Sequence, residues 1–288
     1  MKVVHVLLAV LVAAIWGFNF VVIRVGLDAM PPILFAGLRF ALAAVPAFWI
    51  ARPAVPWPRL IAIAGFLFVI QFAGLFSAMA VGMPPGVGSV TLQAQALFTT
   101  LFAGLLLREW PRPVQAVGLL IALCGLVLIG ATAGSGGITW PGLMLTLVAA
   151  AGWGMGNVLL RGTKADLLPL MVWLSLLSAP PLLLGSWAIE GTDVAIHALR
   201  AMSWLAFGAL GYIAIISTLL GYVIWGHLLR QYPATTVAPF ALLVPFFGAG
   251  ASAILLGETF TPLRIAGFVL ILAGVAIVAR PPSATDVS

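Results

Sequence analysis

The chain has 288 residues, of which 63% are hydrophobic and 7% are charged, and its formal net charge is +6. A soluble domain carries about 25% charged residues, so this composition excludes a protein that folds with water as its main solvent. The basic residues are dispersed over short connections and form no cluster, which argues against a nucleic-acid partner. The partner that the composition predicts is the lipid bilayer.

Apolar segments follow one another along nearly the whole chain. A membrane-spanning helix needs about 20 apolar residues. We predict ten such segments, in chain order 4–25, 31–51, 60–82, 86–107, 113–132, 140–160, 168–188, 201–228, 234–257 and 262–279. The connections are too short for a domain outside the membrane. The longest, around Glu190 to Arg200, has room for one turn at the membrane surface.

The distribution of lysine and arginine predicts how these segments are oriented, because cytoplasmic loops carry an excess of both. With the amino terminus inside, nine basic residues fall on the cytoplasmic side: Lys2, Arg52, Arg59, Arg108, Arg112, Arg161, Lys164, Arg230 and Arg280. Only three fall outside: Arg24, Arg200 and Arg264. This bias predicts a multi-pass protein of the cell (inner) membrane with both termini in the cytoplasm.

The last five segments repeat features of the first five. An ungapped alignment of 13–17 with 150–154 sets Trp16 against Trp153. A second one sets Glu109 against Glu258 and matches a proline and two glycines further along: Pro113 with Pro262, Gly118 with Gly267, and Gly125 with Gly274. Five spans is an odd number, so the second copy must cross the membrane inverted, as in many secondary transporters. The sequence therefore predicts an all-α membrane protein of ten transmembrane helices in an inverted 5+5 repeat, divided into 1–133 and 134–288.

Several short motifs are distributed over both halves of the chain. They are Ala-Ile-Trp-Gly-Phe-Asn at 14–19, Leu-Arg-Phe at 38–40, and Pro245 followed by Leu-Leu-Gly-Glu at 255–258, Pro262 and Gly267. Together they resemble EamA-type proteins of the drug/metabolite transporter superfamily, over the whole chain, and the length is similar to that of the ten-helix amino-acid and metabolite exporters. The resemblance implies the drug/metabolite transporter fold and export. One departure is Ala96 at the place of Pro245, so we expect the fourth segment to be straighter than the ninth.

Aromatic and polar residues inside the segments are the candidates for substrate binding. Trp16 and Asn19 share one helix face, and Trp153 and Asn157 do the same in the second copy. Arg39 is the one charge well inside a segment, and burying it is costly. It is either an anchor for a substrate carboxylate or a structural arginine bonded to backbone carbonyls of a neighbouring helix.

Three glutamines and a tyrosine extend this set. Gln71, Gln93 and Gln95 must face protein or water rather than lipid. At about 100° per residue, Gln93 and Gln95 point in nearly opposite directions, so we expect only one of them to line a cavity. Tyr222 contributes to a mixed polar face on the eighth segment. A central cavity is thus predicted between segments one, three, four, six, eight and nine, with segments five and ten at the periphery.

No Asp or Glu lies in a segment interior, which argues against exchange of substrate for a proton at a buried acid. Glu109 and Glu258 are expected to fix helix-end turns. The single Cys124 is expected to be packed, and with no Cys or His beside it we predict neither a metal site nor a cofactor.

The leading hypothesis is a transporter that exports small amphipathic metabolites, above all amino acids including aromatic ones, by alternating access through the central cavity. The alternative is a carrier of nucleotide-sugars or phosphorylated sugars, which would need several buried basic residues. An intramembrane serine protease is excluded because Ser89 and His227 fall near opposite faces of the membrane, and an ion channel would need charged rings or a carbonyl filter. We therefore expect a monomeric transporter of a small molecule and no enzyme.

Overall fold

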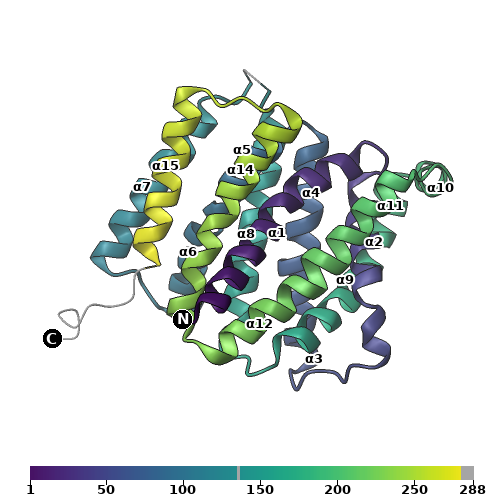
Figure 1. Ribbon diagram of the computed structural model, residues 1–288, viewed down its shortest axis with the longest axis horizontal. Helices are drawn as coiled ribbons and strands as arrows, with labels where there is room; N and C mark the ends of the chain where they lie inside the picture. Colours follow the sequence, from purple (N-terminus) through teal and green to yellow (C-terminus); the bar gives the residue numbers. More distant parts are fainter. Residues whose placement is uncertain (135–136, 280–288) are drawn as a thin grey trace.

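The computed structural model describes residues 1–134 and 137–279, and these ranges are almost entirely helical (Figure 1). Within them, eight helices are long and apolar enough to cross a membrane: Val3–Leu27, Trp57–Ala80, Pro85–Leu107, Pro113–Gly130, Trp140–Leu160, Leu167–Ile189, Trp204–Gln231 and Ala238–Leu256. Two shorter apolar helices, Pro32–Phe48 and Pro262–Val278, fall at the remaining predicted segments. The expectation of an all-helical, multi-pass membrane protein is confirmed.

Several of these helices contain irregular turns, so they carry more than one label. In chain order the α-helices are α1 (Val3–Leu27), α2 (Pro32–Ala43), α3 (Trp57–Ala64), α4 (Gln71–Ala80), α5 (Pro85–Thr91), α6 (Gln95–Leu107), α7 (Pro113–Gly130), α8 (Trp140–Leu160), α9 (Leu167–Ile189), α10 (Thr192–Arg200), α11 (Trp204–Gly211), α12 (Gly221–Gln231), α13 (Ala234–Val237), α14 (Leu243–Leu256) and α15 (Pro262–Val278). The turns between them are π-helical at Gly65–Ile70 and Tyr212–Leu220, and 3₁₀-helical at Val45–Phe48, Leu92–Ala94 and Ala238–Leu242. π-Helical turns are rare and occur often at functional sites.

One predicted segment boundary differs from the structure. The eighth segment begins at Trp204 rather than 201, because the Ser203 side chain accepts a hydrogen bond from the Ala206 amide and starts the helix there. The fourth segment contains a 3₁₀ turn at Leu92–Ala94 although Ala96 replaces the proline, and the ninth segment contains one at Ala238–Leu242. The two ends of the fourth segment pack on different partners, α5 on α14 and α6 on α8.

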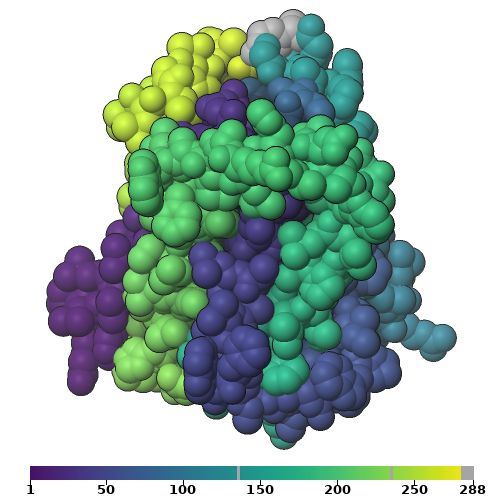
Figure 2. Space-filling view, turned by 90° about the vertical axis from the view of Figure 1, so that its right-hand side faces the viewer, coloured from purple at the N-terminus to yellow at the C-terminus, as the bar shows by residue number. Residues whose placement is uncertain are grey.

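The long connection after α9 forms a helix of its own. α10 lies across one end of the molecule, as both views show (Figures 1 and 2). The amino terminus and the end of α12 lie at the opposite end (Figure 1). Glu190, at the end of α9, accepts hydrogen bonds from the amides of Ile33 at 2.7 Å and Leu34 at 2.9 Å, and so caps α2. This cap joins α2 to the helix along which it packs.

α7 and α15 pack against each other at one edge of the molecule (left in Figure 1). Glycines make this possible: a Cβ added to Gly118 would lie 2.8 Å from the Gly274 carbonyl oxygen, and one on Gly125 would lie 2.6 Å from that of Gly267. Small residues allow such close backbone approach between membrane helices. Cys124 lies on the exposed face of α7, so the expectation that it is packed is wrong; the glycines take the contact face instead.

Candidate functional site

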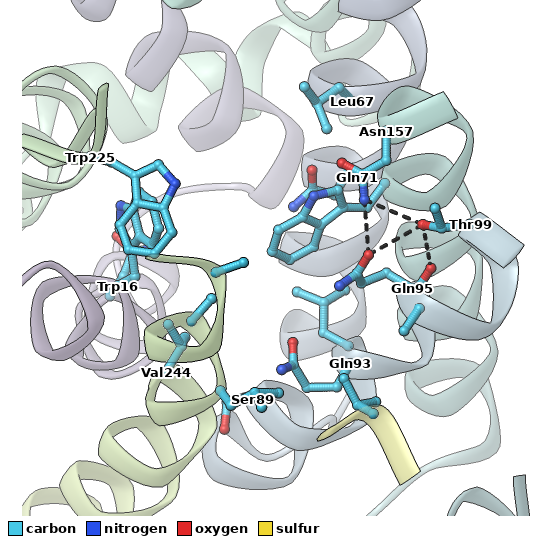
Figure 3. Close-up of a pocket in the computed structure, with 18 of the residues that line it drawn as sticks. Trp16, Leu67, Gln71, Ser89, Gln93, Gln95, Thr99, Asn157, Trp225 and Val244 are labelled. Carbon is cyan, nitrogen blue, oxygen red and sulfur yellow. Dashed lines mark hydrogen bonds between the residues drawn. The ribbon is translucent and has the colours of Figure 1, made fainter. Parts of the chain in front are cut away.

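A central cavity of about 630 Å³ lies between the helices (Figure 3). All nine residues that the sequence singled out line it: Trp16, Asn19, Arg39, Gln71, Gln93, Gln95, Trp153, Asn157 and Tyr222. Most of the wall comes from the six predicted segments, and among the described lining residues none belongs to α7. The tenth segment is less peripheral than expected, because Val275 and Val278 at the end of α15 reach the cavity.

One side of the cavity is aromatic. The Trp16 ring lies 5.3 Å from the Tyr222 ring and 5.2 Å from the Trp225 ring, measured between centroids, and the Trp16 indole donates to the Ser217 carbonyl at 3.0 Å. Gly221 leaves room for the indole, since a Cβ there would lie 2.8 Å from Trp16 Nε1. Trp225, which was not among the predicted residues, also lines the cavity, and its spacing of three from Tyr222 places it on the same helix face.

The other side carries amides. Asn157 Nδ2 donates to Gln95 Oε1 at 2.9 Å and to the Thr99 hydroxyl at 3.3 Å, which ties α8 to α6 (Figure 3). Gln71 and Gln93 face the cavity nearby (Figure 3). The expectation that only one of Gln93 and Gln95 lines the cavity is therefore wrong. The reason is the 3₁₀ turn at Leu92–Ala94: with about three residues per turn, the two side chains are separated by a smaller angle than in an α-helix.

Arg39 enters the cavity from α2 and is 4% exposed. Its Nε and Nη2 donate to the Thr218 hydroxyl at 3.1 and 3.0 Å, and its guanidinium lies 4.3 Å from the centre of the Phe72 ring. If Arg39 is structural, we expected it to bond to backbone carbonyls of a neighbouring helix. Its partner on that helix is instead the side-chain hydroxyl of Thr218. Thr218 donates its own proton to the Ile213 carbonyl at 2.7 Å, which leaves its lone pairs for Arg39. Ile213 and Thr218 both lie in the π-helical turn Tyr212–Leu220, and the spacing of five residues in such a turn brings the hydroxyl of Thr218 to the carbonyl of Ile213.

Two polar atoms beside the cavity have no protein partner. Among the described side chains, Arg39 Nη1, a donor, and Asn19 Oδ1, an acceptor, are buried without a hydrogen bond. Trp16 and Arg39 bond to the consecutive residues Ser217 and Thr218, and Asn19 lies one turn from Trp16. Buried polar atoms are normally satisfied, so a ligand or water is the expected partner of this donor and acceptor.

Residues 4–131 and 140–280 each match the sequence profile of a protein family described as the EamA-like transporter family. The chain belongs to that family. As an EamA-like transporter it moves a solute across the membrane, and the expectation that it is no enzyme is confirmed.

Two bacterial relatives align with this EamA-like transporter over nearly their whole length. A protein of Salmonella typhimurium is 44% identical over 277 residues, covering 94% of this chain and 93% of the relative. A protein of Escherichia coli K12 is 40% identical with the same coverage. Both are named "Probable amino-acid metabolite efflux pump". A crystal structure with 19% identity aligns over 96% of both chains with a TM-score of 0.63, which supports a shared fold.

Proposed function

We propose that this EamA-like transporter exports small zwitterionic metabolites, above all amino acids including aromatic ones. One observation carries the proposal: an unpartnered buried donor on Arg39 and an unpartnered buried acceptor on Asn19 flank one cavity. A carboxylate matches the first and an ammonium group matches the second. The names of the two relatives point to the same class of solute.

The rest of the wall suits such a solute. Trp16, Tyr222 and Trp225 offer a surface for an apolar or aromatic side chain, and the amides opposite are neutral. Arg39 is the one cation among the described lining residues, and no Asp or Glu is among them. A nucleotide-sugar or sugar phosphate would need several buried cations, so we favour the zwitterion.

We further propose the ten-helix inverted arrangement, with the two copies at 1–133 and 134–288. Matched contacts support it. A Cβ on Gly17 of α1 would lie 2.6 Å from Phe247 Cβ of α14, and one on Gly154 of α8 would lie 2.7 Å from Phe98 Cβ of α6. The two ungapped alignments of the sequence set Gly17 against Gly154 and Phe98 against Phe247. The third and eighth spans, which correspond to each other by their order in the two copies, each contain a π-helical turn.

Alternating access follows from this arrangement, with the two halves rocking about a solute at their interface. We place both termini in the cytoplasm of a cell (inner) membrane and treat the chain as a working monomer. With that orientation the lining of the cavity extends to cytoplasmic helix ends, at Leu160, Leu229 and Val278. The conformation is then inward-open.

Flux into proteoliposomes tests the substrate. Purified protein should exchange phenylalanine better than phenethylamine, which lacks the carboxylate. Arg39→Lys keeps the charge and loses the planar fork, and Asn19→Ala removes the acceptor. Each should weaken phenylalanine exchange about tenfold, as expected for lost hydrogen bonds to charged groups. Equal exchange of amine and amino acid, or unchanged exchange in both folded variants, would contradict the proposal.

A further inference from the structure

The predicted outer ends of α5 and α14 are joined by a carboxylate. α5 begins with Pro84-Pro85 and has no cap from a side chain of its own. Glu258, just after α14, accepts hydrogen bonds from the amides of Gly86 at 2.8 Å and Val87 at 3.1 Å, and also from the Ser252 hydroxyl. The amides at a helix start have no partner within the helix, and the helix dipole favours a negative charge there.

The backbones around this cap approach closely. A Cβ on Gly86 would lie 2.9 Å from Glu258 Oε2 and 3.2 Å from Ala249 Cα, and one on Gly248 would lie 2.7 Å from Ser89 Cβ. Ser89 is 2% exposed. The outer end between the first-half helix α5 and the second-half helix α14 is therefore closed, and the cap of Glu258 spans that closure.

The matching carboxylate at the cytoplasmic end is bound differently. The alignment that sets Glu109 against Glu258 also sets Pro84 against Pro233, and so sets the α5 start against the α13 start. Glu109 forms an ion pair with Arg161 of α8's end, and both side chains are about half exposed, at 51% and 55%. The amide of Thr236, which corresponds to Val87, donates to the Pro233 carbonyl at 2.9 Å.

We infer that Glu258 and Glu109 are reciprocal latches of the transport cycle, an inference that rests on the proposed alternating access. Glu258 caps α5 and holds the outer end closed while the cavity is open to the cytoplasm. When the molecule opens outward, Glu258 leaves α5, and Glu109 leaves Arg161 to cap the start of α13. The exposed pair with Arg161 contributes little, whereas a cap of two helix-start amides favours the state that contains it. The two carboxylates therefore bias the same equilibrium in opposite directions.

Labelling of a reporter cysteine measures this bias without any substrate. Ser89→Cys in a Cys124→Ala background should react slowly with an impermeant maleimide added to intact cells. Glu258→Gln leaves one acceptor oxygen for two amides, so it should raise the labelling rate about tenfold. Glu109→Gln should lower the rate below that of the parent. Ala241→Cys, at a cavity-lining position, should be labelled in inside-out vesicles in the opposite order. Glu258→Gln should lower its labelling rate below that of the parent, and Glu109→Gln should raise it.

Glu190→Gln is the matched control, because Glu190 caps a Pro-Pro helix start with the same chemistry but joins α2 to its packing partner α9. It should leave the Ser89→Cys rate within about twofold of the parent. Unchanged labelling in folded Glu258→Gln, or the same direction of change for Glu258→Gln and Glu109→Gln, would overturn the latches. Reciprocal labelling in a protein that exchanges no amino acid would sustain the latches and refute the proposed substrate.

Discussion

Single residues decide how the aromatic side of the cavity is built. The Trp16 indole reaches the Ser217 carbonyl because Gly221, one turn further along the same span, has no side chain. The centre of the Trp16 ring thereby lies 5.3 Å from that of Tyr222, where we propose that a substrate side chain binds. The absence of a side chain at residue 221 thus allows the observed position of the cavity-lining Trp16.

We expect Gly221→Ala to weaken substrate binding. Its Cβ would lie 2.8 Å from Trp16 Nε1, so the indole must shift and lose its hydrogen bond to Ser217. A lost hydrogen bond and a displaced ring should raise KM for phenylalanine about fivefold, measured by proteoliposome flux. Gly211→Ala is the control, since a Cβ at Gly211, in the same span, meets nothing within 4 Å. Equal KM values for the two variants would show that Trp16 is not part of the binding surface.

Irregular turns within single elements position the site. The π-helical turn Tyr212–Leu220 presents the Ser217 carbonyl to Trp16 and the Thr218 hydroxyl to Arg39. The 3₁₀ turn at Leu92–Ala94 brings Gln93 and Gln95 to the same cavity. In both spans the deviation from α-helical geometry moves polar groups toward the centre of the molecule. α7, which has no such turn, packs against α15, and none of the described cavity-lining residues belongs to it.

The packing of α7 on α15 should be sensitive to one methyl group. In Gly274→Ala the new Cβ would lie 2.4 Å from the Gly118 carbonyl oxygen, which forces the helices apart. Overpacking of this kind costs about 1–3 kcal/mol, so the melting temperature in detergent should fall. Gly208→Ala has nothing within 4 Å of its new Cβ and should be neutral or slightly stabilising. A melting temperature for Gly274→Ala equal to that of Gly208→Ala would mean that this helix pair is loosely packed.

At the scale of the whole molecule, orientation in the membrane determines which end is the gate to the cytoplasm. The bias of lysine and arginine predicts this orientation. With the termini inside, α10 and both carboxylate caps, of Glu190 and Glu258, lie outside.

Cysteine labelling tests this orientation. Thr192→Cys, at the exposed start of α10, should react with an impermeant reagent in intact cells. The Cys124→Ala background is needed because Cys124 is exposed. A cysteine at Lys164, in the α8–α9 connection, should react only after lysis. The reverse pattern would place both termini outside and exchange the two ends of the proposed cycle.

The sequence by itself determined that the chain is helical and crosses the membrane many times, and it predicted that Trp16, Trp153 and Arg39 line a central cavity. It could do so because hydropathy reports burial in lipid directly, and because a polar residue among apolar ones must face protein or water. The tertiary structure decided the contacts. That Arg39 meets Thr218, that Glu258 caps α5, and that Gln93 and Gln95 share a cavity depend on irregular turns and helix crossings. Those follow from packing between distant segments, which no local pattern in the chain encodes.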